Sequence, residues 1–180
     1  MRKIENSELD RLNVEEFKRH PKNPLVLVLD DIRSMHNVGS AFRTADAFLL
    51  EKIYLCGITA TPPHRDINKT ALGATESVDW EYAAQASEIL AGLKDQGYHI
   101  LVVEQTDHST LLPQFQPQSE HKYVLVFGNE VFGVKEDLLL LADEHLEIPQ
   151  FGTKHSLNIS VSLGIVVWSL MEKMNLLGTP

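Results

Sequence analysis

Nearly continuous apolar segments, each followed by a polar loop, are the feature that most constrains the fold of this chain. Residues 25–32 read LVLVLDDI, and three further runs of this kind lie at 52–58, 98–103 and 123–127. A strand without polar alternation is typically buried on both faces, as in a parallel sheet. Segments with apolar residues at helical spacing separate the strands, at about 38–49 and 85–96. This alternation predicts an α/β domain with a mostly parallel sheet and helices on both faces.

Composition divides the chain into a polar N-terminal arm and one larger domain. The 180 residues suit a single domain, and a hydrophobic fraction of 43% is enough for a sizeable core. In the arm, 1–24, apolar residues spaced among charges predict a helix over 6–19, which the breaker HPKNP at 20–24 ends. The domain is assigned to 25–180, and within it the polar, Pro-containing segment 61–73 is expected to be a loop.

The second half of the domain has fewer clear signals. Residues 104–122 are expected to be irregular, and a short Leu-rich helix and the strand HLEIP come after GNEVFG. The last predicted helix, within SLNISVSLGIVVWSLMEKM at 156–174, is apolar nearly all round. Such a helix is either buried or part of a subunit interface.

The charge of the chain weakens the case for a nucleic-acid partner without excluding it. The formal net charge is −9, and acidic residues crowd 130–147. Cations are concentrated elsewhere, and Arg33, Arg65 and Lys69 are the candidate RNA contacts. A local basic rim of this kind is able to hold phosphate groups in spite of the total charge.

Several kinds of site and location are excluded by residue counts and spacing. Cys56 is the single cysteine, so the chain has no internal disulfide and no cysteine-based metal cluster. The eight histidines lack tight ligand spacing, so we expect no metal. The polar start and the absence of a long apolar run predict no signal peptide and no membrane span, and hence a cytoplasmic protein.

The motif NVGSAFR, at 37–43, follows the first strand. Asn37 is predicted to cap the helix that begins there, and Arg43 lies off its apolar stripe. A helix N-terminus beside a guanidinium is suited to binding a phosphate group. The alternative is an ordinary capped helix with a solvated arginine.

The motif FGNEVFG, at 127–133, follows a later strand. Glycines flank Asn129 and Glu130, but the motif matches neither the phosphate-binding GxxxxGK[ST] nor the dinucleotide fingerprint GxGxxG. It predicts a turn whose backbone holds a small ligand, or simply a glycine-containing turn from strand to helix.

The motif IPQFGTKHSLNISVSLG, at 148–164, follows the last strand. Gly152 indicates a tight loop, Ser156 is a candidate cap of the final helix, and Asn158 places an amide within an otherwise apolar first turn. A buried amide needs partners. We therefore expect Asn158 to bind another loop or a ligand, the alternative being a capping network alone.

Taken in order, NxGxxxR, GNExxG and IPQxGxxxSLNxSVSxG resemble the SpoU (TrmH-like) family of RNA ribose 2′-O-methyltransferases, within the SPOUT superfamily. The resemblance runs from about Leu25 to Met174. It implies an α/β fold with a C-terminal trefoil knot, a rare exception to unknotted topology. It also implies S-adenosylmethionine as cofactor, a homodimer to which the last helix contributes, and methylation of a ribose 2′-hydroxyl in tRNA or rRNA.

The resemblance also assigns roles to residues at matching positions. The implied catalytic residues are Asn37, Arg43, Glu130 and Asn158. The implied cofactor contacts are Val103, Glu104, Gly128, Asn129, Ile148, Ser156 and Leu157. At Glu104 the chain departs from the small or hydroxyl residue that many relatives have, so the contacts at this wall are the least defined.

Chemistry limits what Arg43 does in such a reaction. A guanidinium keeps its proton at a pKa above about 12 and has no acceptor, so it is not a general base. Arg43 is therefore expected to stabilise the developing alkoxide, or to hold the adjacent phosphate so that the phosphate takes the proton. Asn37 is expected to orient Arg43 or the ribose, and Glu130 to fix Arg43 or the facing motif of a second subunit.

Three functional hypotheses follow. The first is an RNA 2′-O-methyltransferase that acts on tRNA, with rRNA as the alternative substrate. The second is a non-catalytic RNA-binding or S-adenosylmethionine-binding protein of the same fold, against which the intact set of motif residues argues. The third, a Rossmann-type small-molecule methyltransferase, lacks the glycine-rich loop after the first strand.

Overall fold

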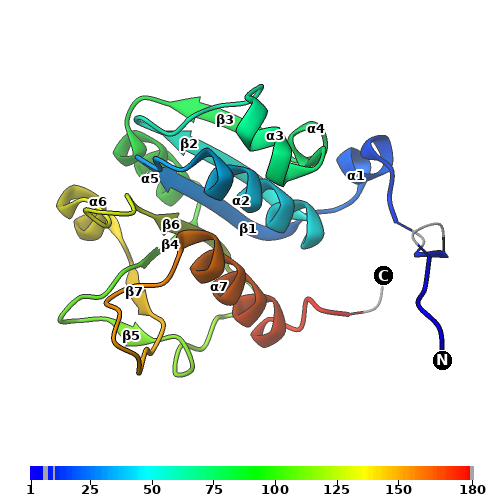
Figure 1. Cartoon of the computed structure of the whole chain (residues 1–180). Helices are drawn as coiled ribbons and strands as arrows, with labels where there is room; N and C mark the ends of the chain where they lie inside the picture. Colours follow the sequence, from blue (N-terminus) through cyan, green and yellow to red (C-terminus); the bar gives the residue numbers. More distant parts are fainter. Residues whose placement is uncertain (6–7, 10, 179–180) are drawn as a thin grey trace.

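The computed structural model describes residues 1–5, 8–9 and 11–178 of the chain. In this part, a seven-stranded sheet has the order β3-β2-β1-β6-β4-β7-β5, and all neighbouring strands run parallel (Figure 1). The strands are β1 (Asn23–Asp30), β2 (Leu50–Cys56), β3 (Trp80–Ala83), β4 (Tyr98–Val103), β5 (Thr110–Leu111), β6 (Lys122–Phe127) and β7 (Glu144–Glu147). The predicted mostly parallel sheet is confirmed.

Helices cover both faces of the sheet, as predicted (Figure 1). They are α1 (Val14–Arg19), α2 (Met35–Ala47), α3 (Arg65–Ala71), α4 (Ala74–Ser77), α5 (Ala86–Asp95), α6 (Glu136–Leu141) and α7 (Ile159–Lys173). Helices α2, α3, α4 and α7 contribute to the core on one face, and α5 and α6 contribute to the core on the other.

Strand β1 shows why its sequence lacks polar alternation. It lies between β2 and β6, and its side chains alternate between the two cores. Leu25, Leu27 and Leu29 point into one core and Val26 and Val28 into the other. All five are at most 1% exposed. A central strand that is covered on both faces needs apolar residues at every position.

The register of the sheet brings three strand ends to one edge. Val102 of β4 pairs with Val126 of β6, and Val103 of β4 pairs with Leu146 of β7. Strands β6, β4 and β7 are neighbours, so their carboxyl ends lie together. Ligands of parallel α/β sheets bind beyond such ends.

The segment 61–73 is not the predicted loop, because it contains helix α3. His64 caps this helix, and Ile67 and Ala71 are buried at i, i+4 spacing. The helix lies close to α2 at Gly39, where a Cβ would be 2.3 Å from the Ile67 carbonyl oxygen. Two prolines just before α3 dominate the local composition and mask its short apolar repeat.

Strand β3 and helix α4 are absent from the sequence-based expectation. Strand β3 pairs with β2 at one end of the sheet, and its sequence WEYA is too short to show periodicity. Trp80 nevertheless fixes it, since the indole packs edge-to-face on Phe42, with 6.5 Å between ring centroids.

The arm helix is shorter than the predicted 6–19. Helix α1 begins after Asn13, whose side chain forms a capping box with Glu16. Residues 6, 7 and 10 of the predicted helix lie outside the described residues. Phe17 is buried in the core and α1 contacts α4, so α1 packs on the domain. The division into an arm and a domain at residue 24 stays a prediction.

Helix α7 begins later than predicted and has two unlike faces. Its cap is Asn158 rather than Ser156, and the Asn158 side chain accepts the Ser160 amide hydrogen. One face is buried in the core, whereas Val161, Ile165 and Trp168 are exposed. Near the end of the helix, Lys173 Nζ donates to carbonyl oxygens of the loop between β5 and β6.

The trefoil knot implied by the family resemblance is a property of the whole chain path and stays a prediction.

Over the described residues, no helix is both long and apolar enough to cross a bilayer.

Candidate functional site

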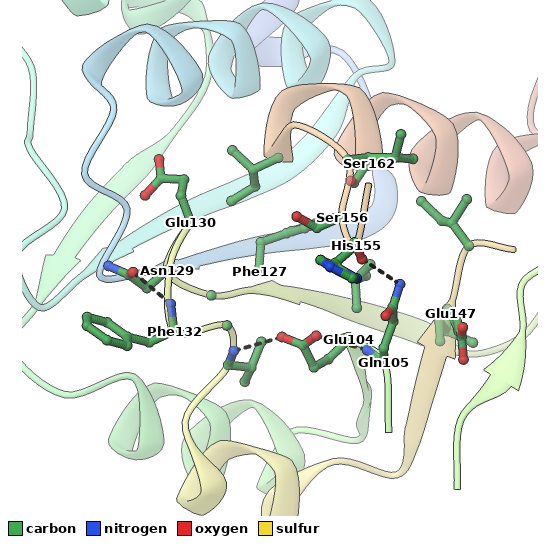
Figure 2. Close-up of a pocket in the computed structure, with 18 of the residues that line it drawn as sticks. Glu104, Gln105, Phe127, Asn129, Glu130, Phe132, Glu147, His155, Ser156 and Ser162 are labelled. Carbon is green, nitrogen blue, oxygen red and sulfur yellow. Dashed lines mark hydrogen bonds between the residues drawn. The ribbon is translucent and has the colours of Figure 1, made fainter. Parts of the chain in front are cut away.

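A cavity of about 700 Å³ lies at the shared carboxyl edge of β4, β6 and β7 (Figure 2). Four segments contribute most of its wall: 103–106 after β4, 127–134 after β6, 146–148 after β7 and 155–159 at the start of α7. A volume in this range suits a cofactor-sized ligand. Two of the three sequence motifs, 127–133 and 148–164, therefore meet the end of β4 at one space.

All seven predicted cofactor contacts line this cavity. They are Val103, Glu104, Gly128, Asn129, Ile148, Ser156 and Leu157. Two of the four predicted catalytic residues, Glu130 and Asn158, line it as well. The functional roles of these residues stay predictions, whereas their common location is a finding.

A chain of side-chain hydrogen bonds joins the three sequence motifs beside the cavity. Asn37 Nδ2 donates to Glu130 Oε1 at 3.0 Å, and Asn158 Nδ2 donates to Asn37 Oδ1 at 3.2 Å. Asn158 Oδ1 in turn accepts hydrogen bonds from the backbone amide and hydroxyl of Ser160. Each amide group both donates and accepts, so the three loops hold one another in place.

Asn37 does not cap α2, contrary to the prediction. The cap is Ser34, whose hydroxyl accepts the Asn37 amide hydrogen, and Asn37 lies within the first turn. Glu130 adds a second cap from another loop, because its carboxylate accepts the backbone amides of Arg33 and Ser34 at 2.9 and 3.0 Å. A carboxylate at a helix N-terminus also interacts favourably with the helix dipole.

The pKa of Glu130 reflects these contacts. Partial burial raises the pKa, but the hydrogen bonds from the two backbone amides and from Asn37 outweigh it, so the pKa lies below its usual value. Glu130 is therefore ionised at neutral pH. Contrary to one expected role, its partners in the described structure are Asn37 and the start of α2 rather than Arg43.

The loop after β6 is shaped by Asn129 and its two flanking glycines. Asn129 and Gly133 exchange backbone hydrogen bonds of 3.0 and 2.9 Å, and Asn129 Oδ1 accepts the amides of Val131 and Phe132. A Cβ on Gly128 would lie 2.4 Å from the Gly133 carbonyl oxygen. The motif therefore requires glycine for close packing of its own backbone.

Glu104 ties the end of β4 to the same loop. Its carboxylate accepts the Gln105 amide at 2.9 Å and the Val134 amide at 3.0 Å. A Cβ on Gly133, whose φ is +69°, would lie 2.3 Å from Glu104 Oε2. This residue, the point of departure from many relatives, thus forms part of the cavity wall.

The cavity is electrostatically negative. Glu104, Glu130 and Glu147 line it, whereas lysine and arginine are absent from the lining formed by the described residues. Leu139, Leu146 and other aliphatic side chains supply an apolar part. Such a lining favours a ligand that carries positive charge and an apolar or aromatic portion.

Arg43 lies on a different surface from the cavity. It borders a smaller cavity of about 300 Å³, together with Asn13 of the arm, Asp46 of α2 and residues of α3 and α4, and in the described structure it does not line the large cavity. Arg43 lies six positions after Asn37 on the same helix, which is about 9 Å along the axis and on another face. The sequence motif alone does not reveal this separation.

The candidate RNA contacts are dispersed. Arg33 is exposed beside Glu130, and Arg65 and Lys69 lie one turn apart on the exposed face of α3. None of the three lines the large cavity within the described residues. Their proposed role stays a prediction.

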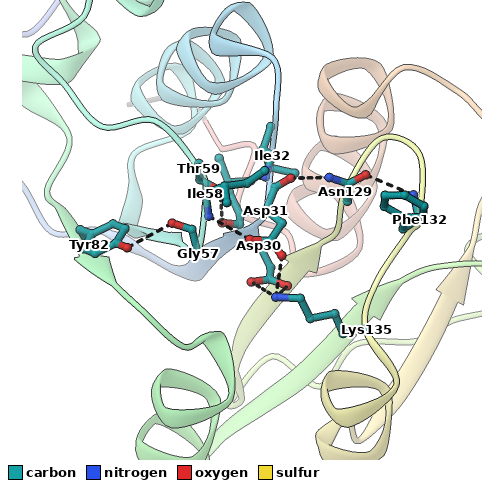
Figure 3. Close-up of polar contacts among 11 residues, drawn as sticks. Asp30, Asp31, Ile32, Gly57, Ile58, Thr59, Tyr82, Asn129, Phe132 and Lys135 are labelled. Atoms are coloured by element: carbon teal, nitrogen blue, oxygen red, sulfur yellow. Dashed lines mark hydrogen bonds and ion pairs between the residues drawn. The ribbon is translucent and has the colours of Figure 1, made fainter.

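An ionic cluster around the buried Asp30 lies next to the loop after β6 and was missed by sequence reasoning (Figure 3). Lys135 Nζ lies 2.9 Å from Asp30 and 2.7 Å from Asp31, and Asp30 is 2% exposed. Burial raises the pKa of Asp30, although the lysine opposes the rise, and burial next to Asp30 raises the pKa of Cys56 to about 12. The paired aspartates after the first strand were the available signal.

Asp31 connects this cluster to the cavity loop. Its backbone is left-handed, with φ of 54°, and its carbonyl oxygen accepts Asn129 Nδ2 at 2.7 Å. Its carboxylate also accepts the Ile58 amide after β2 (Figure 3). The loop after β6 is thus attached at Asn129 and at Lys135 to the end of β1.

Comparison with known families agrees with this arrangement. Residues 24–168, which include the three motifs, match the model of the SpoU rRNA Methylase family. The chain belongs to this family. The resemblance noted from the sequence motifs is thereby confirmed.

Individual relatives include enzymes that act on rRNA and on tRNA. A 23S rRNA (guanosine-2′-O-)-methyltransferase RlmB of Neisseria meningitidis is 34% identical over 80% of this chain, which spans 56% of that relative's length. A tRNA (guanosine(18)-2′-O)-methyltransferase of Thermus thermophilus is 27% identical over 94% of this chain and 85% of its own.

Solved structures share the fold. The A. aeolicus TrmH/SpoU tRNA modifying enzyme has a TM-score of 0.78, at 24% identity over 90% of this chain and 80% of that one. An AdoMet-bound rRNA methyltransferase from Sinorhizobium meliloti has a TM-score of 0.77, at 25% identity over 88% of this chain and 59% of that one.

Proposed function

We propose that this chain is an S-adenosylmethionine-dependent methyltransferase that modifies a ribose 2′-hydroxyl in RNA, with tRNA as its substrate. The observation that carries the proposal is the hydrogen-bond chain Glu130–Asn37–Asn158, which joins the three family motifs at one cavity. Membership of the SpoU family supports the reaction. Support for tRNA comes from the Thermus relative, which aligns over most of both chains.

The residues present fit the cofactor. S-adenosylmethionine carries a sulfonium and an ammonium group, and the cavity lining combines carboxylates with aliphatic side chains such as Leu146 and Ile148. When bound, the cofactor supplies an electrophilic methyl group. Glu104, Gly128 and Asn129 would form one wall of its site, and Ser156 and Leu157 the other.

The catalytic half of the proposed site is the Arg43 surface. A guanidinium there stabilises negative charge on the ribose oxygen or holds the neighbouring phosphate, as its permanent charge dictates. Because Arg43 and the large cavity lie on different surfaces of one chain, we propose that Arg43 acts at the cavity of a second copy. The active unit is then a homodimer.

The exposed face of α7 supports this homodimer. Val161, Ile165 and Trp168 are exposed at helical spacing on an otherwise core-facing helix, and they border a groove of about 700 Å³. Trp168 also packs edge-to-face on Phe48, which follows α2, with 6.0 Å between centroids. An interface at this face would therefore include both α7 and the end of α2, the helix that carries Arg43.

Arg33, Arg65 and Lys69 are proposed to supply the basic rim that holds RNA phosphates. Binding should then weaken as salt concentration rises. The reaction as proposed needs no metal, and the location that fits an RNA substrate and a reduced cysteine is the cytoplasm.

Nucleoside mass spectrometry of tRNA and rRNA from a strain that lacks the gene tests the proposal. One 2′-O-methylated nucleoside is expected to disappear from the tRNA fraction and to return when the wild-type gene is restored. Its disappearance from rRNA instead would reassign the substrate. If every methylated nucleoside persists and purified protein transfers no labelled methyl group to either RNA, the non-catalytic alternative holds.

A further inference from the structure

Two phenylalanines differ from the others in the chain by being almost fully exposed. Phe132 is 86% exposed and Phe151 is 96% exposed, whereas Phe17, Phe42, Phe115 and Phe127 are buried and Phe48 is partly buried. Both exposed rings belong to loops that follow strands at the cavity edge, Phe132 after β6 and Phe151 after β7. Their position is therefore tied to the candidate site.

Phe132 is exposed although its loop is held in place by several hydrogen bonds. The Phe132 amide donates to Asn129 Oδ1 at 3.2 Å, and the next residue, Gly133, is paired with Asn129 through two backbone bonds. Asn129 is bound to the Asp31 carbonyl oxygen, and Lys135 binds the Asp31 carboxylate (Figure 3). The backbone that carries the ring is fixed on both sides, so little conformational entropy is lost when the ring binds a partner.

Phe132 stands at the mouth of the large cavity and forms part of its lining (Figure 2). The adjacent Val131 is also exposed, which widens the apolar surface at this point. On the loop after β7, Gln150 and His155 line the cavity, and Phe151 lies next to Gln150. Phe132 thus lines the cavity itself, and Phe151 follows a lining residue on a separate loop.

Positive charge accompanies these rings although the cavity is negative. Arg33 is exposed on the chain segment held by Glu130, which is two residues before Phe132. Lys154 is exposed on the loop that carries Phe151. Exposed aromatic rings beside cations are the combination with which proteins stack on unpaired nucleobases and hold the adjoining phosphates.

We propose that Phe132 and Phe151 form a stacking platform for a nucleobase of the RNA at the mouth of the cavity, with Phe132 as its main, preorganised contact. The inference rests on the proposed function and deepens it, since it names residues that bind RNA by ring contact. Stacking tolerates any base, because every base has an aromatic face. The platform therefore sets affinity for an unstacked nucleotide and leaves base identity to other contacts.

Kinetics of Phe132→Ala test the platform. Its KM for tRNA is expected to rise about tenfold, as the loss of one stacked base predicts, with kcat and S-adenosylmethionine affinity within about twofold of wild type. Phe132→Tyr should restore the wild-type KM, because its ring keeps the stacking face. Leu140→Ala is the matched control: Leu140 is 87% exposed on α6 and lies outside the cavity lining, so its removal should leave KM unchanged.

Fluorescence of Phe132→Trp gives a measurement that does not depend on methyl transfer. Single-stranded uridine and adenosine 12-mers should quench the added indole beyond any change in the wild-type chain, whose natural tryptophans are Trp80 and Trp168. Phe151→Ala in this background should reduce the quenching.

The two assays separate the outcomes. If purified protein methylates no RNA, the proposed function fails, and the quenching alone decides the platform. An unchanged KM in Phe132→Ala together with no added quenching overturns the platform while leaving the methyltransferase intact. The platform is also overturned if Phe132→Ala lowers the affinity for S-adenosylmethionine or the sedimentation coefficient of the dimer. The ring would then contact the cofactor or the second subunit rather than a nucleobase.

Discussion

The large cavity and the Arg43 surface differ in how completely one chain builds them. At the cavity, Glu130, Asn37 and Asn158 come from three motifs and are bound to one another, so the site is held without any partner. Arg43, by contrast, is exposed beside the arm, α3 and α4 and borders a separate, smaller cavity. One chain therefore builds the whole candidate cavity, whereas Arg43, the cation proposed to act there, lies on another face of the same chain.

Helix α2 connects the two regions. Its first turn is held by Ser34 and Glu130 and carries Asn37, and Arg43 follows about two turns later on another face. Gly39 lies between them and allows α3 to approach closely. Asn37 and Arg43 thus belong to one helix whose two ends take part in the two regions.

The largest effect is expected from Arg43→Ala. Loss of the guanidinium should lower kcat for methyl transfer at least about 100-fold, the usual cost of removing a preorganised electrostatic contact. Cofactor affinity by calorimetry and the free energy of unfolding should match wild type, because Arg43 lies away from the large cavity. Arg43→Lys should also lose most turnover, since an ammonium lacks the planar fork. Near-normal turnover in Arg43→Lys would contradict the proposed role.

Mixed dimers sharpen the comparison. Arg43→Ala and Asn158→Ala protein, each inactive alone, should together recover about a quarter of wild-type activity, because half of randomly mixed dimers then have one intact site. This recovery requires that Arg43 acts at the partner's cavity. No recovery after verified subunit exchange would place Arg43 and Asn158 in the same chain's site.

Lys135→Met should weaken the large cavity without changing the Arg43 surface. It leaves Asp30 buried without its cation. We expect a loss of about 2 kcal/mol in the free energy of unfolding, less than the roughly 3–5 kcal/mol of a fully buried broken pair, because Lys135 is half exposed. Urea unfolding measures the loss, and cofactor affinity should fall with it as the loop after β6 loosens.

Two variants check the interpretation of Lys135→Met. Adding Asp30→Asn and Asp31→Asn should recover much of the lost stability by removing the unpaired charges. The exposed Lys69→Met should leave unfolding within about 0.5 kcal/mol of wild type. Equal losses in Lys69→Met and Lys135→Met would mean that the cluster has no special part in the cavity.

The smallest effect concerns acid stability. The pKa of Glu130 lies below its usual value in the folded chain, so its favourable contribution is present above the unfolded pKa, near 4.5, and is lost as pH falls through the folded pKa. Glu130→Gln lacks this titration, and its unfolding free energy should fall less steeply than that of wild type below about pH 4.5. Urea unfolding of both proteins at roughly pH 3 to 6 measures the difference. If the unfolding free energies of wild type and Glu130→Gln fall in parallel over this range, folding does not lower the pKa of the carboxylate.

Sequence patterns predicted the parts of the fold that depend on local composition. Central strands such as β1 need apolar residues at every position, so they were recognised, and so were the glycine loops at strand ends. Strand β3 and helix α3 were missed, because a few residues with little periodicity are fixed by distant contacts such as Trp80 on Phe42. Local composition does not contain those partners.

The sequence motifs predicted that Asn37, Glu130 and Asn158 would lie together, but not the geometry of their contacts. Motif order placed Asn37, Glu130 and Asn158 in one site, yet the hydrogen bonds between them span 93 and 121 positions and follow from the fold alone. Asn37 was predicted as a cap because asparagine is a good one, but Ser34 and Glu130 occupy that role. The separation of Arg43 from the cavity likewise depends on the direction of α2.

The buried thiol of Cys56 has a practical consequence. It is inaccessible, and burial raises its pKa to about 12, so it stays in the unreactive thiol form at neutral pH. As the chain has no other cysteine, a single surface substitution such as Lys69→Cys would give one reactive position for a spin label. Distances between the labels of paired copies would then map how two molecules of this protein face each other in solution.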